Sequence, residues 1–162
     1  MQNVAVLFVC TGNICRSPTA EGVFRALLLK HGLQDKVRTD SAGTQDFHAG
    51  APPDRRAIAH ARARGYDISG LRARQLHEGD FAAFDLVLAM DRGHLQFMER
   101  ICAPQYRARL KLFLDFAGVP DADVPDPYYG REEGFEQVLD MAEAASRGLI
   151  DHVRGYLGCV ST

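Results

Sequence analysis

The sequence predicts an α/β fold, in which a single domain contains a four-stranded, mostly parallel sheet flanked by helices on both faces. Short apolar runs alternate with helix-like stretches along the chain, which is typical of a parallel sheet. A length of 162 residues with 46% hydrophobic content suits one well-buried core. Since no linker, repeat or low-complexity segment interrupts this order, we expect one domain over residues 1–162.

The chain begins with a predicted strand and a predicted helix. Residues 4–9 form a continuous apolar run with the length of a buried strand. Residues 17–31 carry apolar side chains at helical spacing, and Gly32 follows as a stop. Ser17 and Pro18 are residue types preferred at an N-cap and at the first helical position. We therefore expect Ser17 to be the N-cap of this helix.

The remaining elements continue the alternation. Strands are predicted at 37–41, 85–90 and 110–114, and helices at 53–64, 91–101 and 135–157. Gly65 ends the second helix, and Asp91 is placed to begin the third. Ligands of open α/β sheets bind beyond the carboxyl ends of the strands, so we expect a phosphate-binding loop directly after the first strand.

The segment that joins the first strand to the first helix reads Cys10-Thr11-Gly12-Asn13-Ile14-Cys15-Arg16-Ser17-Pro18. A loop at a helix N-terminus gathers unpaired backbone N–H groups at the positive end of the helix dipole, and therefore favours an anion. Gly12 and Asn13 tolerate positive φ, which lets a short loop turn its amides inward. The phosphate-binding residues predicted in this loop are Thr11, Gly12, Asn13, Ile14 and Cys15.

Cys10 and Arg16 give this loop the groups that phosphoryl chemistry needs. A helix N-terminus and a neighbouring cation favour the thiolate form of a cysteine, so Cys10 is the candidate nucleophile. Arg16 presents a planar fork of donors that can bind two phosphate oxygens and hold their charge in the transition state. The alternative for Cys10 is a buried packing cysteine, and the alternative for Arg16 is a solvated arginine.

The loop at residues 9–18 resembles the signature loop of low-molecular-weight protein tyrosine phosphatases. A second match lies far downstream, where Asp126-Pro127-Tyr128-Tyr129-Gly130 corresponds to the Asp-Pro-Tyr-Tyr segment of that family. Lesser matches occur at residues 40–44 and 73–75. The resemblance therefore spans nearly the whole chain and implies hydrolysis of phosphotyrosine through a phosphocysteine intermediate.

The resemblance also implies individual roles. Asp126 is expected to protonate the leaving phenolate as a general acid, and then to activate water as a general base. Ser17 is expected to donate its hydroxyl to the Cys10 thiolate, and Ser41 to help hold Asn13. Leu71 departs from the pattern, because many relatives carry histidine there, and it therefore predicts a looser phosphate loop.

Aromatic residues are candidates for the walls of a substrate pocket. Phe47, Tyr128 and Tyr129 could line a slot deep enough for a phosphotyrosine ring but too deep for phosphoserine, and ordinary packing is the alternative for each. Cys15 lies close to Cys10 in the same loop, so it is a candidate redox partner that would capture an oxidised Cys10. The alternative for Cys15 is a small apolar side chain that fills space.

Two other functions stay open. The protein-arginine phosphatases share the scaffold, but they usually have threonine at the position of Ile14. The isoleucine in this chain therefore favours phosphotyrosine as the substrate. A phosphate-binding or redox-sensing module would need no turnover, and the presence of both Cys10 and Asp126 counts against it.

Composition limits the partners and the compartment. The net charge of −2 and the lack of like-charge runs exclude a nucleic-acid-binding tail. Four cysteines without framework spacing, and no signal peptide or membrane span, predict a cytoplasmic protein. No metal or other cofactor is predicted, because residues 121–126 lack the glycine of a calcium loop and no cysteines have zinc spacing. The expected partner is a phosphotyrosine-containing protein, with a tyrosine kinase as a further candidate from the resemblance; the oligomeric state is not predicted.

Overall fold

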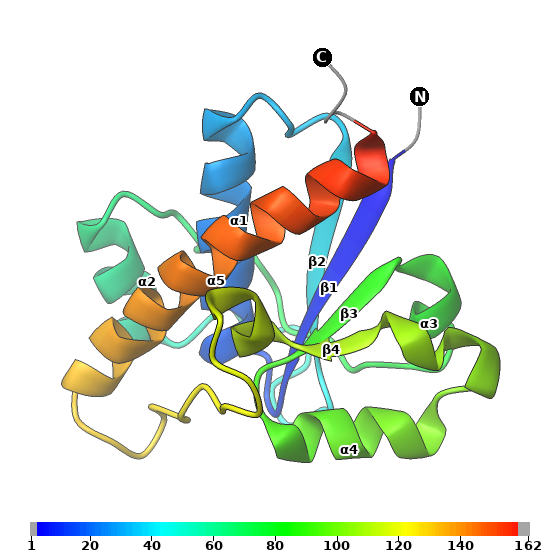
Figure 1. Cartoon of the computed structure of the whole chain (residues 1–162). Coiled ribbons are helices and arrows are strands. Elements are labelled where there is room, and N and C mark those ends of the chain that lie inside the picture. The colour runs from blue at the N-terminus through cyan, green and yellow to red at the C-terminus, as the bar shows by residue number, and fades with distance from the viewer. Residues whose placement is uncertain (1–2, 159–162) are drawn as a thin grey trace.

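The computed structural model describes residues 3–158, and its centre is a four-stranded sheet (Figure 1). The strands are β1 (Val4–Cys10), β2 (Val37–Gly43), β3 (Leu86–Ala89) and β4 (Leu110–Leu112). They lie in the order β2-β1-β3-β4, and every neighbouring pair is parallel. The predicted α/β class and parallel sheet are therefore confirmed, and β1 occupies an interior position.

Helices cover both faces of this sheet (Figure 1). One face packs against α1 (Arg16–Lys30), α2 (Arg55–Ala63) and α5 (Glu133–Leu157), and the other against α3 (Asp80–Ala83) and α4 (Arg92–Ile101). The 3₁₀ segments η1 (Pro104–Arg109) and η2 (Phe113–Ala117) flank β4. The two layers of helices bury both faces of the sheet, as expected for parallel strands.

The first strand is buried over its whole length because it contributes to two cores. Val6, Phe8 and Cys10 belong to the apolar cluster shared with α1 and α5, whereas Leu7 and Val9 belong to the cluster shared with α4. This is the two-residue alternation of a strand, with an apolar partner on each side. A continuous apolar run is therefore the correct signature for this strand.

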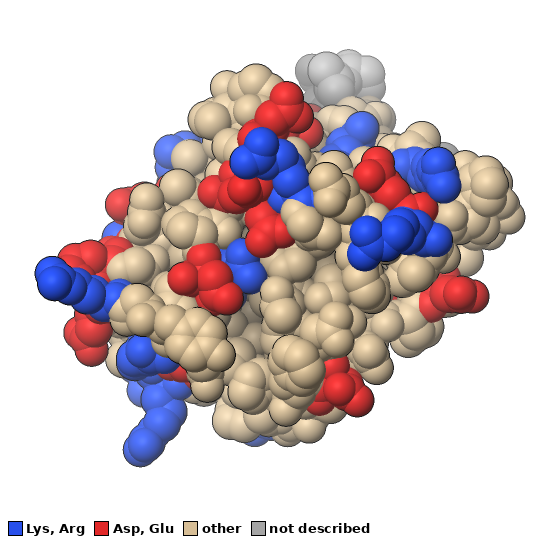
Figure 2. Space-filling view, turned by 90° about the horizontal axis from the view of Figure 1, so that it is seen from below, with Lys and Arg blue, Asp and Glu red and all other residues tan. Residues whose placement is uncertain are grey.

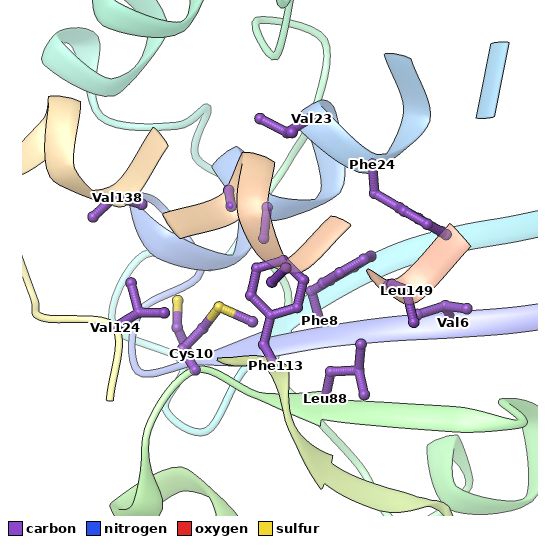
Figure 3. Close-up of a cluster of buried hydrophobic side chains, with 14 of the residues drawn as sticks. Val6, Phe8, Cys10, Val23, Phe24, Leu88, Phe113, Val124, Val138 and Leu149 are labelled. Carbon is purple, nitrogen blue, oxygen red and sulfur yellow. The ribbon is translucent and has the colours of Figure 1, made fainter. Parts of the chain in front are cut away.

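Phe8 lies near the centre of the larger cluster (Figure 3). Its ring centroid is 5.8 Å from that of Phe24 in α1 and 5.5 Å from that of Phe113 in η2. Burial of a side chain of this size stabilises the fold by about 1.5–3 kcal/mol. Figure 3 shows Cys10 in the same row along β1, so the thiol lies at the end of this buried cluster.

The prediction that Ser17 caps the first helix is wrong. The helix begins at Arg16 with Cys15 at the N-cap position, and no side chain caps it. The Ser17 hydroxyl instead accepts a hydrogen bond from Nδ2 of Asn13 (2.7 Å) and lies 3.0 Å from Sγ of Cys10. A tertiary role therefore replaces the local one that the residue type suggested.

Other boundaries shift for physical reasons. The fourth strand ends at Leu112 rather than at residue 114, because Phe113 turns into the core and begins η2. The second strand is longer than predicted and continues to Gly43, which pairs with Cys10. Asp91 does cap α4, since its carboxylate accepts a hydrogen bond from the backbone N–H of His94.

Parallel pairing brings the carboxyl ends of β1, β2 and β3 to one edge of the sheet, at the bottom of Figure 1. The backbone N–H of Val124 donates to the carbonyl of Met90 (2.8 Å), which attaches the loop after η2 to the end of β3. Among the helices of residues 3–158, none is long and apolar enough to cross a bilayer.

Candidate active site

The loop between β1 and α1 is held from outside by its carbonyl groups. Those of Cys10 and Thr11 accept hydrogen bonds from the N–H groups of Thr44 (2.8 Å) and Gln45 (3.1 Å), and that of Ile14 accepts from Asp54 (2.8 Å). In the part of the chain that the structure describes, no backbone N–H from residue 12 to 17 donates to another protein group. These unpaired donors at a helix N-terminus form an environment suited to an anion.

Asn13 supports this loop from within. It has φ 60° and is buried, and its Nδ2 donates to the hydroxyls of Ser17 (2.7 Å) and Ser41 (2.9 Å). Its Oδ1 accepts from the backbone N–H of Arg74 (3.0 Å). The hydrogen bonds stabilise a left-handed conformation that asparagine tolerates better than most residues. Leu71 packs against the core and is not among these hydrogen-bond partners.

Gly12 serves a different purpose from the one predicted. Its φ is not positive, so the loop does not need glycine for its backbone conformation. A Cβ at this position would lie 3.0 Å from Cδ2 of His48. Glycine therefore allows the His48 ring to approach the loop closely, and Asn13 alone supplies the positive φ expected of this pair.

The Cys10 thiol and the Ser17 hydroxyl are in hydrogen-bond contact at 3.0 Å. Because Asn13 donates to the Ser17 oxygen, the one proton of this hydroxyl is available to the sulfur. This orientation lets Ser17 stabilise negative charge on Cys10. Cys10, Ser17 and Asn13 are all buried, so the arrangement is not disturbed by bulk water.

Arg16 is held by the ends of two other segments. It is only 4% exposed, and its Nη1 donates to Oδ2 of Asp91 (2.9 Å) and to the carbonyl of Val124 (3.0 Å). Its Nη2 lies 3.6 Å from Oδ2 of Asp126. Asp91 is a site residue that the sequence revealed only as a helix start, because its role depends on the pairing of β1 with β3.

Asp126 reaches the same place from a loop more than a hundred residues downstream. Its Oδ1 accepts from the backbone N–H of Tyr128 (3.0 Å), and its side chain is 45% exposed. The loop is attached on one side by the bond from Val124 to Met90. On the other side, Nη2 of Arg56 in α2 donates to the carbonyl of Tyr128 (3.0 Å). The carboxyl group therefore faces the pocket with one oxygen unbound by the backbone.

A pocket brings most of the predicted residues together. Its lining consists of Cys10, Thr11, Gly12, Ile14, Cys15, Arg16, Phe47, His48, Asp126, Tyr128 and Tyr129. Asn13, Ser17 and Ser41 lie behind this lining and support it. His48 is the wall residue that the sequence analysis missed, since a single histidine after Phe47 carries no distinctive pattern.

The aromatic walls differ in exposure. Phe47 is 68% and Tyr129 is 92% exposed, whereas Tyr128 is partly buried. The Tyr128 ring lies edge-on to Tyr129, with centroids 4.8 Å apart, and its centroid is 6.1 Å from that of His48. The mouth of the pocket is therefore apolar, and its floor carries the thiol and the arginine.

Cys15 lines the same pocket as a free thiol. Burial raises the pKa of Cys15 far above its ordinary value, and the charges of Asp54 and Cys10 add to this effect. The thiol is therefore protonated at neutral pH, which suits space filling. A disulfide with Cys10 stays a prediction.

Charges of both signs surround the pocket. Figure 2 shows the face at the carboxyl ends of the strands, where acidic and basic side chains are interspersed. Arg92 pairs with Asp123 (3.1 Å), and Arg56 with Asp54 (2.9 Å). Within residues 3–158, no group of His, Cys, Asp and Glu is placed to hold a metal ion.

The chain matches one family model and many known proteins. The model is described as low molecular weight phosphotyrosine protein phosphatase and matches residues 5–156. A low molecular weight protein-tyrosine-phosphatase from Streptomyces coelicolor is 48% identical over 154 residues, covering 92% of this chain and 93% of that protein. A putative one from Synechocystis is 46% identical over 147 residues, covering 90% and 93%.

Solved structures agree with these sequence matches. A protein tyrosine phosphatase from Entamoeba histolytica superimposes with a TM-score of 0.89 at 37% identity, covering 98% of this chain and all of that one (100%). YfkJ from Bacillus subtilis superimposes with a TM-score of 0.86 at 36% identity, covering 96% and 98%.

Proposed function

Because the chain belongs to the low molecular weight phosphotyrosine protein phosphatase family, we propose that it hydrolyses phosphotyrosine in proteins through a phosphocysteine intermediate. The observation that carries this proposal is the pocket itself, in which a buried thiol, a buried arginine and a carboxyl group from a distant loop converge. Cys10 is the nucleophile, Arg16 binds the phosphate, and Asp126 is the general acid and base.

In the first step, the Cys10 thiolate attacks phosphorus, and the bond from phosphorus to the phenolic oxygen breaks. Asp126 transfers its proton to that oxygen, so that tyrosine leaves as a neutral phenol instead of a phenolate. The unpaired N–H groups of the loop and the Arg16 guanidinium bind the equatorial oxygens of the phosphoryl group throughout. The contact of Arg16 with Asp126 supports this role, because it brings acid and cation to one side of the pocket.

In the second step, water attacks phosphorus, and the bond from sulfur to phosphorus breaks. Asp126, now ionised, accepts a proton from the water, and phosphate and the Cys10 thiolate are the products. The Ser17 hydroxyl stabilises the charge that returns to sulfur, since it lies 3.0 Å from Sγ and can donate its proton to a thiolate there. Over the two steps, Asp126 regains its proton and Cys10 becomes a thiolate again. Water is the only reactant consumed besides the phosphotyrosine.

The proposed substrate is a phosphotyrosine-containing protein. A phosphate on the floor would place an aromatic ring between Phe47, His48 and Tyr128, where it finds apolar contacts. A phosphoserine side chain has no ring for these walls to contact, so we expect it to bind more weakly. We further propose a tyrosine kinase as a candidate partner and the cytoplasm as the site of action, where a reducing environment keeps the catalytic thiol free.

The test compares peptides that contain phosphotyrosine, phosphoarginine or phosphoserine. We expect phosphotyrosine to be hydrolysed fastest and Cys10→Ser to abolish turnover while it still binds inorganic phosphate. Cys102→Ser is the matched control, since this buried free thiol lies at the end of α4 and outside the pocket lining. Faster turnover of phosphoarginine, or an active Cys10→Ser, would overturn the proposal.

A further inference from the structure

A buried histidine lies behind Arg16, and the mechanism above does not use it. His94 is in the first turn of α4, and its side chain is 7% exposed. Its Nε2 lies 2.8 Å from the hydroxyl oxygen of Thr11, a residue of the phosphate loop. Its Nδ1 lies 3.1 Å from Oδ1 of Asp91, the aspartate that pairs with Arg16.

These contacts close a ring around one end of the arginine. Arg16 Nη1 donates to Oδ2 of Asp91 (2.9 Å), and Arg16 Nη2 donates to the Thr11 hydroxyl (3.4 Å). His94 bridges Asp91 and Thr11 on the far side. One imidazole therefore contacts both of the side chains that hold the guanidinium.

The direction of each hydrogen bond follows from the donor types. Arg16 can only donate, so the Thr11 oxygen accepts from it and its own proton is available to His94. With Nε2 of His94 as the acceptor of that proton, the ring proton is on Nδ1, the nitrogen that lies 3.1 Å from Oδ1 of Asp91. The opposite tautomer would set the Nδ1 lone pair against a carboxylate oxygen. Burial lowers the pKa of His94 to about 4, which keeps the ring neutral near pH 7.

We propose that His94 is a positioning residue for the phosphate-binding arginine, because it orients both the Thr11 hydroxyl and the Asp91 carboxylate against Arg16. The proposal rests on the proposed function, since Arg16 is the group that binds the phosphate there. Without the imidazole, the proton of the Thr11 hydroxyl loses its acceptor, and Oδ1 of Asp91 loses its contact with Nδ1 of His94. Arg16 would then be freer to turn toward Asp126, 3.6 Å away, instead of toward a bound oxyanion.

The first measurement uses the wild-type protein. Nitrogen NMR of histidine side chains distinguishes a protonated from an unprotonated ring nitrogen. We expect the resonances of His94 at pH 7 to show protonated Nδ1 and unprotonated Nε2. A ring protonated at Nε2 would overturn the proposal, and this result requires no variant that folds.

The second measurement is the affinity for inorganic phosphate, by calorimetry. His94→Phe keeps an aromatic ring but removes the acceptor, and we expect about tenfold weaker binding, which corresponds to one hydrogen bond in a buried network. His94→Gln restores an amide acceptor near Thr11 and should recover most of the affinity. Thr11→Val should weaken binding similarly, and the double variant with His94→Phe no further.

His152→Phe is the matched control, because this partly buried histidine of α5 packs between Phe116 of η2 and Tyr156 of α5, away from the pocket. It should bind phosphate as the wild type does. A folded His94→Phe with unchanged phosphate affinity, or losses that simply add in the double variant, would overturn the proposal. Phosphate binding without turnover of any phosphotyrosine peptide would instead contradict the proposed function and leave the role of His94 standing.

Discussion

The two sides of the phosphate loop are held by different kinds of contact. On the thiol side, Asn13 joins Ser17, Ser41 and the backbone of Arg74 through hydrogen bonds between neutral groups. On the arginine side, the guanidinium of Arg16 meets two carboxylates and a hydroxyl. Asn13 and Arg16 are both buried, but Asp126 on the arginine side is 45% exposed, so the two sides differ in charge and also in exposure.

The two kinds of contact differ in whether a bound phosphate would compete with them. The neutral contacts satisfy one another fully, and an incoming phosphate has nothing to displace among them. The charged contacts compete with the ligand, because Arg16 must divide its donors between Asp91, Asp126 and the phosphoryl oxygens. We therefore expect changes on the arginine side to act on binding and turnover, and changes to Asn13 and Ser41 on the thiol side to act mainly on stability.

The largest effect is expected from Arg16→Lys. Lysine keeps the charge but loses the planar fork, so the transition state loses a bidentate contact and kcat/KM should fall about 10³-fold. Steady-state kinetics with a phosphotyrosine peptide measure this change. Arg92→Lys is the control, since Arg92 pairs with Asp123 at the rim and should stay within twofold of wild type, about the scatter of surface substitutions. A loss below tenfold in Arg16→Lys would contradict the assigned role of the guanidinium.

Asp126→Ala should come next. Loss of a positioned acid slows release of a poor leaving group by about 10²–10³-fold, but affects a good one much less. Phenyl phosphate and 4-nitrophenyl phosphate provide the two leaving groups, and single-turnover kinetics isolate the first step. Equal losses for both compounds would show that Asp126 is not the acid.

On the thiol side, Asn13→Ala should act mainly on stability. Alanine is strained at φ 60°, and the change removes three hydrogen bonds, so unfolding should become easier by about 2–4 kcal/mol. Chemical denaturation measures this loss. Ser41→Ala removes one of these contacts and should cost about 1 kcal/mol. If Asn13→Ala instead weakened phosphate binding without lowering stability, the proposed division between the two sides would fail.

The smallest effect is expected in the pH dependence of folding stability, through His94 on the arginine side. Burial lowers the pKa of His94 to about 4, against the charges of Asp91, Asp126 and Asp123, while Arg16 lowers it further. In the unfolded chain, His94 takes up a proton below about pH 6.5, whereas in the folded chain it does so only near pH 4. The contribution of His94 to stability is therefore fully present above pH 6.5 and is lost as the pH falls from 6.5 to 4.

We expect about 1–3 kcal/mol of this loss to come from His94. Denaturation curves between pH 7 and 4 measure it, and His94→Gln should show a correspondingly smaller slope. The same slope in wild type and variant would mean that other groups cause the pH dependence.

The sequence predicts the fold and the chemical groups better than it predicts their support. The strand at β1 and the loop residues Cys10 to Arg16 could be found because their signals are local: an apolar run, then a thiol and an arginine at a helix start. Phe47, Tyr128 and Tyr129 line the pocket, and their role as walls for a substrate stays a prediction.

The supporting residues depend on contacts between distant segments. Asp91 and His94 reach Arg16 only because β3 pairs with β1, and no pattern near residue 91 reports that pairing. Ser17 was assigned to a cap because its residue type favours one, but its hydroxyl is used by Asn13 and Cys10. Local propensity therefore gave way to tertiary hydrogen bonding at the positions that serve the site.

The attachment of Val124 to Met90 has a mechanical consequence. Val124 is buried and fixes the chain on one side of Asp126. The hydrogen bond from Arg56 to the Tyr128 carbonyl fixes it on the other side. Asp126 is two residues from Val124, so even a fully extended chain could place the Cα of Asp126 no farther than about 7 Å from the Cα of Val124. Any displacement of the acid from the pocket is therefore confined to this radius. Its return would order only a very short length of chain, so the cost in chain entropy is small.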